Sequence, residues 1–140
     1  MKSITVMILA FLLLPLSMVA QDEGIDFFEG SWEEAKTEAA ESGKLIFVDA
    51  YAVWCGPCKW MDKNVFTDPA VGTYFNQHFI NYKFDMEKGE GPDFARQYRV
   101  RAYPTLLFIA PDGTEVHRVM GSRQAQQLID VGKEALRQNS

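Results

Sequence analysis

The chain has 140 residues, the size of one domain, and 47% of them are apolar. Its formal net charge of −5 and its lack of a Lys/Arg cluster argue against nucleic-acid binding. This composition predicts a packed globular protein rather than a disordered chain.

Residues 1–20 differ in composition from the rest of the chain. One positive charge, Lys2, precedes a long apolar run, and smaller residues then lead to Ala20. This order is typical of a cleaved secretory signal peptide. Met18 stands where a small residue is usual, so an uncleaved N-terminal membrane anchor is the alternative. We therefore expect a periplasmic or secreted protein.

The mature chain divides into a lead-in, residues 21–30, and one domain, residues 31–140. The domain opens with a predicted helix, in which Ser31 and Glu34 form a capping box and Gly43 suits a left-handed stop. A short apolar run rich in strand formers follows and predicts a buried strand at 45–51.

Two further helices are predicted before the next strand. Helical periodicity resumes after the cysteines, with Pro57 in the first turn. Residues 67–79 predict a short helix that Thr67 or Asp68 caps and Pro69 begins.

The second half of the domain alternates strands and helices. Residues 80–86 predict a strand, residues 89–100 a Gly-rich turn and a brief helix, and residues 105–120 a hairpin around "PDGT". Ser122 is then expected to cap a last amphipathic helix. The apolar side of that helix comprises Ala125, Leu128, Ile129 and Leu136.

The predicted order is therefore α-β-α-α-β-α-β-β-α. Strands separated by helices imply parallel crossovers, and the late hairpin adds antiparallel pairing. The fold class is α/β, with a mixed central sheet and helices on both faces.

The two cysteines of the chain, Cys55 and Cys58, are separated only by Gly56 and Pro57. A disulfide between them would close a very short loop, which stabilises a fold little. If Cys55 begins a helix, its sulfur meets unpaired backbone N–H groups that favour a thiolate. The pattern therefore predicts an exposed attacking thiolate at Cys55 and a resolving thiol at Cys58, on the same helix face.

Two other interpretations of the cysteine pair remain open. The pair could be half of a zinc site, for which the chain offers only His78 and His117, neither at a ligand-like spacing. It could also be an inert surface pair. We expect redox chemistry, with no metal and no cofactor.

Two segments resemble the thioredoxin family. "VDAYAVWCGPCK" is similar to the active-site segment of that family, and "VRAYPTLLFIAPDG" to its proline loop and the hairpin after it. The similarity covers residues 31–136 and implies a thioredoxin-like fold. The helices at 31–43 and 67–79 look more like those of secreted single-domain relatives, and of the soluble thioredoxin-like domain of transmembrane thiol-disulfide interchange proteins, than like cytoplasmic thioredoxin.

The resemblance implies catalytic roles beyond the cysteines. Asp49 matches the buried acid of the family beneath the second cysteine, where burial would raise its pKa and suit it to accept a proton from Cys58. Lys83 matches the lysine that neighbours this acid. The alternatives are a strand-end polar residue for Asp49 and a solvated strand lysine for Lys83.

The resemblance also implies a substrate-binding surface. Pro104 matches the cis-proline of the family, beside which free backbone groups can pair with an extended substrate. Further substrate-binding residues would be Trp54, Gly56, Pro57, Tyr103 and Gly121. Plain packing is the alternative for Trp54, and Trp60 and Met61 are expected in the core. Tyr51, Val53 and a long loop at 87–94 depart from the family pattern, which leaves the choice of partner open.

The expected function is reduction of protein disulfides outside the cytoplasm. Gly56 and Pro57 add no positive partner for the thiolate, which favours a reducing poise. Expected partners are protein disulfide substrates and a membrane thiol-disulfide electron donor, and the protein is expected to be a monomer. The alternatives are a disulfide-forming oxidase or isomerase, and a non-catalytic binding module on the same scaffold.

Overall fold

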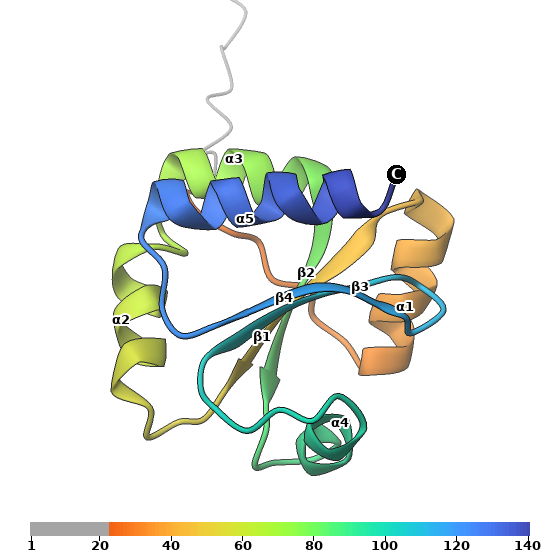
Figure 1. Ribbon diagram of the computed structural model, residues 1–140, viewed down its shortest axis with the longest axis horizontal. Coiled ribbons are helices and arrows are strands. Elements are labelled where there is room, and N and C mark those ends of the chain that lie inside the picture. Colours follow the sequence, from red (N-terminus) through yellow and green to blue (C-terminus); the bar gives the residue numbers. More distant parts are fainter. Residues whose placement is uncertain (1–22) are drawn as a thin grey trace, which may run out of the picture.

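The computed structural model describes residues 23–140 (Figure 1). The predicted signal peptide at 1–20 lies outside the described residues. The order of helices and strands is the predicted one. The elements are α1 (Trp32–Ser42), β1 (Leu45–Tyr51), α2 (Gly56–Asn64), α3 (Pro69–His78), β2 (Phe79–Asp85), α4 (Gly91–Gln97), β3 (Thr105–Ile109), β4 (Glu115–Met120) and α5 (Ala125–Gln138).

The strands form one mixed sheet in the order β2-β1-β3-β4. β1 and β2 run parallel, joined by the crossover through α2 and α3, whereas β3 is antiparallel to both β1 and β4. In the β1–β2 register Asp49 lies opposite Lys83. The sheet therefore brings together two residues that are far apart in sequence.

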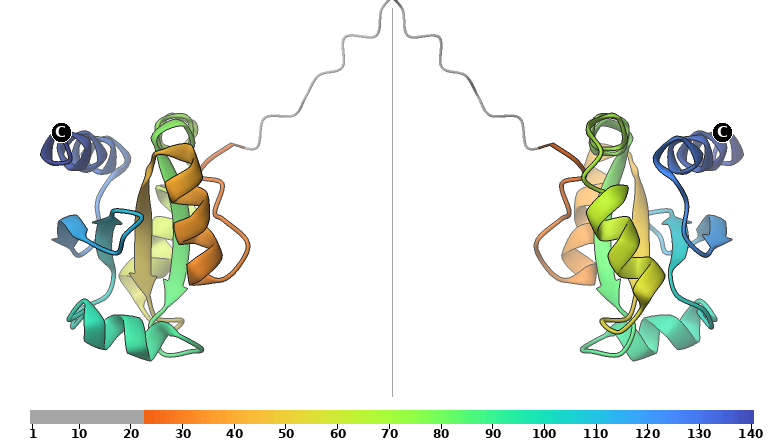
Figure 2. Two further views of the ribbon diagram at one scale, coloured as in Figure 1. Left: turned by 90° about the vertical axis from the view of Figure 1, so that its right-hand side faces the viewer. Right: turned by 90° about the vertical axis from the view of Figure 1, so that its left-hand side faces the viewer.

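Helices cover both faces of this sheet, as predicted (Figures 1 and 2). On one face, α1 and α4 pack on the side chains of Ile46, Val48 and Ala50 from β1. On the other face, α2, α3 and α5 pack on Leu45 and Phe47 of the same strand. This alternation of β1 side chains between two apolar layers explains why its sequence is apolar at nearly every position, Asp49 excepted.

Most of the predicted helix ends are confirmed. Ser31 and Glu34 form the capping box of α1, and Gly43 ends that helix with φ 67°. Asp68 caps α3 by accepting the backbone N–H groups of Ala70 and Val71.

The predicted cap of α5 at Ser122 is wrong, because the N-cap is Gln124. The backbone N–H of Gln124 donates to the side-chain oxygen of Gln127 over 2.9 Å. Ser122 instead lies in the turn after β4, where its carbonyl accepts from Arg123.

The two residues expected in the core of α2 lie in different places. Met61 is fully buried, but Trp60 is 44% exposed. Adjacent helical residues point about 100° apart, so they cannot both face the sheet. The prediction for Trp60 is therefore wrong.

The lead-in packs along β2. Ile25 N donates to the carbonyl of Phe66, and Phe28 N to the carbonyl of Asn81, each over 2.7 Å. Phe27 forms a parallel bridge with Asn81 beside the sheet edge. Among residues 23–140, no helix combines the length and apolarity that crossing a membrane requires.

Candidate active site

Cys55 and Cys58 form a disulfide at the N-terminus of α2, with their Cα atoms 5.3 Å apart. Cys55 is the N-cap of the helix, and its sulfur accepts the backbone N–H of Cys58 over 3.2 Å. The predicted position of this sulfur among free helical N–H groups is therefore confirmed. The same contact would stabilise a thiolate on Cys55 once the disulfide is reduced.

The disulfide form does not expose the sulfur that we expect to attack. Cys55 is only 3% exposed and Cys58 2%. Ala52 is buried beside the pair, and Tyr51 and Tyr103 pack against it. The prediction of an exposed sulfur is thus wrong for the disulfide form, because neighbouring side chains cover it.

Exposed apolar side chains precede the disulfide in the chain and lie at the end of β4, opposite Thr105. Trp54 is 64% exposed, and its ring meets Tyr103 edge-on at 5.8 Å. The indole Nε1–H donates to a carboxylate oxygen of Glu87 over 2.6 Å. Val53 and Met120 are also more than half exposed. Trp54 is therefore a surface residue rather than a core residue, and Glu87, in the long loop after β2, fixes its orientation.

The Tyr103–Pro104 peptide bond is cis, as the resemblance implies. The carbonyl of Pro104 accepts the backbone N–H of Gly121 over 2.8 Å, and Gly121 adopts a left-handed φ of 83°. The structure therefore joins Tyr103, Pro104 and Gly121, with Trp54 packed on Tyr103. Gly56 and Pro57 are exposed in the first turn of α2, next to the disulfide.

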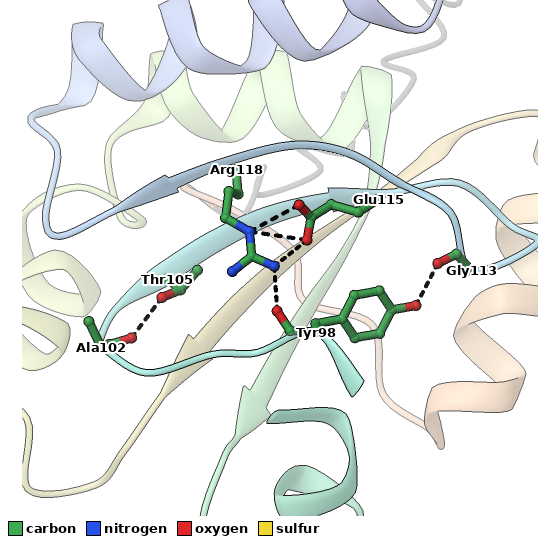
Figure 3. A network of polar contacts seen from close by, with 6 residues as sticks. All are labelled: Tyr98, Ala102, Thr105, Gly113, Glu115 and Arg118. Atoms are coloured by element: carbon green, nitrogen blue, oxygen red, sulfur yellow. Dashed lines mark hydrogen bonds and ion pairs between the residues drawn. The ribbon is translucent and has the colours of Figure 1, made fainter. Parts of the chain in front are cut away.

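A polar network that the sequence did not indicate supports the segment before Pro104 (Figure 3). Arg118 of β4 donates to the backbone carbonyl of Tyr98 and pairs with Glu115. The Tyr98 hydroxyl donates to the carbonyl of Gly113 over 2.7 Å. These bonds tie the end of α4 to the β3–β4 hairpin.

A second bond shapes the segment itself. The Thr105 hydroxyl donates to the carbonyl of Ala102 over 2.7 Å. The segment that carries the cis bond is therefore held both where it leaves α4 and where it enters β3 (Figure 3).

Asp49 lies on β1, on the face that α2 covers, and is 1% exposed. Its Oδ2 accepts from the Lys83 ammonium over 2.9 Å. The alternatives of a simple strand-end residue for Asp49 and a solvated lysine for Lys83 do not hold, because the two side chains form a partly buried ion pair.

Burial raises the pKa of Asp49 from 3.8 to about 6, although the charge and hydrogen bond of Lys83 act to lower it. Burial alone would lower the pKa of Lys83. The charge of Asp49 and the hydrogen bond to Asp62 outweigh that effect, so the pKa of Lys83 lies above its usual range. Asp49 can therefore exchange a proton near neutral pH, whereas Lys83 stays charged.

Asp62 is the acidic neighbour that the sequence interpretation missed. Its carboxylate hydrogen-bonds the same Lys83 ammonium. A signal was present, since Asp62 follows Cys58 by four residues and shares its helix face. Only the structure places Lys83 opposite that face.

The two histidines have ordinary surroundings. The ring of His78 stacks on Tyr74 at 4.3 Å, and His117 of β4 lies 6.1 Å from the ring of Phe108. Within residues 23–140, no group of three or more His, Cys, Asp or Glu side chains is arranged to hold a metal ion.

Comparison with known families assigns the class of protein. Residues 28–111 match a family described as thioredoxin-like. The chain is 40% identical to the thioredoxin-like protein slr0233 of Synechocystis over 90 residues, which are 64% of this chain and 80% of that protein. A thioredoxin H-type of Fagopyrum esculentum is 35% identical over 74% of this chain and 84% of its own length.

Solved structures agree with this assignment. The solution structure of a candidate disulphide-isomerase from Bacteroides thetaiotaomicron is 49% identical, with a TM-score of 0.73 over 84% of this chain and 97% of that one. The oxidised C-terminal domain of DsbD from Neisseria meningitidis has the same fold, with a TM-score of 0.62, 21% identity, and coverage of 73% and 90%. The chain belongs to the thioredoxin-like family of disulfide oxidoreductases and carries the Cys55–Cys58 pair.

Proposed function

We propose that this protein reduces protein disulfides outside the cytoplasm by cycling Cys55 and Cys58 between dithiol and disulfide. The observation that carries the proposal is the disulfide at the start of α2, where the Cys55 sulfur accepts a backbone N–H. An amide donor at this sulfur favours the thiolate, which is the nucleophile of thiol-disulfide exchange.

The reaction consumes one substrate disulfide and two electrons from the protein. The Cys55 thiolate attacks one substrate sulfur, and the other substrate sulfur leaves as a thiolate that takes a proton from water. Cys58 then gives its proton to Asp49 and attacks Cys55. The second substrate thiolate leaves, and Cys55 and Cys58 are joined.

The surface beside the disulfide supports a protein substrate. Trp54 and Met120 offer exposed apolar area, and the cis bond before Pro104 presents the backbone of Tyr103 beside the pair. An extended peptide can pair with free backbone groups there while its side chains contact the apolar residues. Gly56 and Pro57 fit the same role, since they leave the approach to Cys55 free of side-chain charge.

The reducing direction is supported by the uncharged residues between the cysteines. A positive side chain there would stabilise the reduced form and make the protein a stronger oxidant. The extracytoplasmic location rests on the sequence of residues 1–20.

Similarity to one relative suggests what kind of protein donates electrons to Cys55 and Cys58. The chain is 32% identical over 98 residues to the thiol:disulfide interchange protein DsbD of Pseudomonas fluorescens, a match that spans 68% of this chain and 17% of that protein. We propose a membrane thiol-disulfide protein of this kind as the donor that returns Cys55 and Cys58 to the dithiol.

Trapping tests the roles of the two cysteines. A Cys58→Ala variant lacks the resolving thiol, so it should accumulate a stable mixed disulfide between Cys55 and a client, which mass spectrometry would name. The matched Cys55→Ala variant should trap little. Equal trapping through Cys58 would contradict the assigned roles, and no trapping by either variant would contradict the function.

A second candidate function, disulfide isomerisation or formation, is favoured by the similarity to the candidate disulphide-isomerase. Equilibration of the protein with glutathione buffers separates the two directions. A reductase should have a potential near that of thioredoxin, about −270 mV, whereas an oxidase lies nearer −120 mV. A value at the oxidising end would replace reduction by the second candidate.

A further inference from the structure

The ammonium of Lys83 is shared between two carboxylates of very different exposure. It hydrogen-bonds Oδ2 of Asp49 and Oδ1 of Asp62. The side chains are 1% exposed for Asp49, 26% for Lys83 and 44% for Asp62. The three groups therefore form a continuous line of hydrogen-bonded charges from the buried face of β1 to the exposed surface of α2.

Aromatic rings fix the position of this ammonium. The Nζ atom of Lys83 lies 4.5 Å from the ring centre of Tyr51, 5.4 Å from that of Phe27 and 5.3 Å from that of Phe66. Rings favour a nearby cation and surround it on several sides. These contacts favour the position in which the Lys83 ammonium hydrogen-bonds both carboxylates.

The ion pair with Lys83 engages only one of the two carboxylate oxygens of Asp49. Its Oδ1 atom is buried and finds no hydrogen-bond partner among the described residues. An unpaired buried carboxylate oxygen is costly, and the cost falls when that oxygen takes up a proton. The ion pair thus occupies one oxygen of Asp49 and leaves the other able to receive a proton.

We propose that Asp62 is a positioning residue that, by sharing the Lys83 ammonium with Asp49, keeps the Asp49 carboxylate basic enough to accept the proton of Cys58. Without Asp62, no second carboxylate would offset the effect of the Lys83 charge on Asp49. The pKa of Asp49 would then fall, and Asp49 would be a weaker base. The inference rests on the proposed function, in which Asp49 is the proton acceptor.

Asp62 assists the step that releases the substrate from Cys55. The Cys58 S–H bond breaks, its proton moves to Asp49, and the sulfur keeps the electron pair. That sulfur bonds to the sulfur of Cys55, and the bond from Cys55 to the substrate breaks, so the substrate sulfur leaves as a thiolate. Asp49 later returns the proton to water.

In the disulfide form, in which Cys55 and Cys58 do not titrate, the titratable groups that face Asp49 come from three elements. They are Tyr51 of β1, Lys83 of β2 and Asp62 of α2. Opposite Asp49, β3 places Leu106, which carries no charge. The charge of Asp62 acts to raise the pKa of Asp49, in agreement with the proposal.

Titration of the Asp49 carboxyl carbon by NMR tests the coupling without any assay of activity. In the oxidised protein, Asp62→Asn should lower the Asp49 midpoint by about 0.5–1 pH unit, because the removed charge no longer competes for Lys83. Asp62→Glu should keep the original midpoint. Asp93→Asn, which removes an exposed carboxylate paired with Arg96, is the matched control and should also leave it unchanged.

A double variant tests whether the coupling runs through the lysine. In a Lys83→Met background, adding Asp62→Asn should shift the Asp49 midpoint by less than it does with Lys83 present. An equal shift in both backgrounds would overturn the sharing of the ammonium, and so would an Asp49 midpoint that Asp62→Asn leaves in place.

A kinetic measurement tests the catalytic consequence. A mixed disulfide between Cys55 and a model peptide is formed, and the release of the peptide by Cys58 is followed against pH. Asp62→Asn should move the rate profile to lower pH by the same amount as the carboxyl midpoint and lower the plateau rate.

The outcomes separate this inference from the proposed function. If the carboxyl midpoint and the rate profile both stay unchanged, the role of Asp62 is refuted while disulfide reduction stands. If the carboxyl midpoint moves but the rate profile does not, Asp49 is not the proton acceptor, and the role of Asp62 falls with it.

Discussion

Asp49 is a buried acid whose ionisation lowers the stability of the fold. It is 1% exposed on a central strand, where Val48 and Ala50 on either side of it are fully buried. Burial is the main reason that its pKa rises to about 6, despite the ion pair with Lys83. A hydrophobic residue would suit this position better, so a buried acid with a raised pKa here is consistent with the proposed role of Asp49 as proton acceptor.

The raised pKa of Asp49 predicts the direction of a stability change. Between pH 3.8 and about 6 the folded protein holds a proton that the unfolded chain releases, so stability falls as the pH rises through this window. Asp49→Asn removes the cost of burying the charge. We expect the variant to be about 2–3 kcal/mol more stable at pH 8.

Urea unfolding of the oxidised protein at several pH values measures this effect. The gain from Asp49→Asn should shrink toward zero near pH 4, where the wild-type carboxyl is protonated in the folded state. Asp93→Asn, an exposed acid on α4, serves as the control and should give no such gain. A variant less stable than wild type at pH 8 would show that the ion pair outweighs the burial of Asp49.

At the scale of elements, α2 and the β3–β4 hairpin approach the disulfide from two sides. α2 supplies the backbone N–H at the Cys55 sulfur, and the segment before β3 supplies the cis bond at Pro104. That segment has no regular secondary structure, so its shape depends on the bonds that Arg118 and Thr105 make to its ends.

Arg118→Met should therefore loosen the segment before Pro104. The carbonyl of Tyr98 loses its donor, which should cost about 1–2 kcal/mol in urea unfolding. Amide hydrogen exchange should accelerate over residues 99–103, and reduction of a protein substrate should slow.

Arg137→Met is the matched control for Arg118→Met. Arg137 also pairs with a glutamate three residues earlier, Glu134, but on the exposed surface of α5. The Arg137→Met variant should change neither the stability nor the amide hydrogen exchange near Pro104. Equal effects of the two substitutions would mean that the Tyr98 contact has no special role.

At the scale of the whole molecule, the lead-in is part of the folded unit and of the site. Phe27 contacts the ring of Phe66 edge-on at 5.4 Å and lies beside the ammonium of Lys83. The backbone of Gly24 also approaches Gly72 of α3 so closely that a Cβ on Gly72 would lie 2.2 Å from the Gly24 carbonyl oxygen. The lead-in therefore packs directly against the backbone of α3.

This close approach predicts an unusual response to Gly72→Ala. Alanine in a helix normally stabilises by about 1 kcal/mol relative to glycine. Here the new methyl group should displace the lead-in and destabilise the fold by about 1–3 kcal/mol. The amides of Ile25 and Phe28, which bond Phe66 and Asn81, should lose protection from hydrogen exchange.

The amides of β1 provide the internal reference for Gly72→Ala, since they lie in the centre of the sheet and should keep their protection. A Gly72→Ala protein that is more stable than wild type would show that the lead-in contributes little to the fold.

The sequence by itself determined the order of the elements, most helix ends and the redox pair. These depend on local rules: the apolar run of β1, the caps Ser31 and Asp68, and the spacing of Cys55 and Cys58 act over a few residues. The resemblance to thioredoxins added Asp49, Lys83 and the cis bond at Pro104, which local patterns alone do not specify.

Only the tertiary structure decided which distant groups meet. Asp62 shares Lys83 with Asp49 because the parallel register of β1 and β2 and the packing of α2 bring three separate segments together. Trp60 was placed wrongly because apolar character does not reveal which side of a short helix faces the sheet. Contacts across the fold depend on how elements pack, and no local pattern in this sequence encodes that packing.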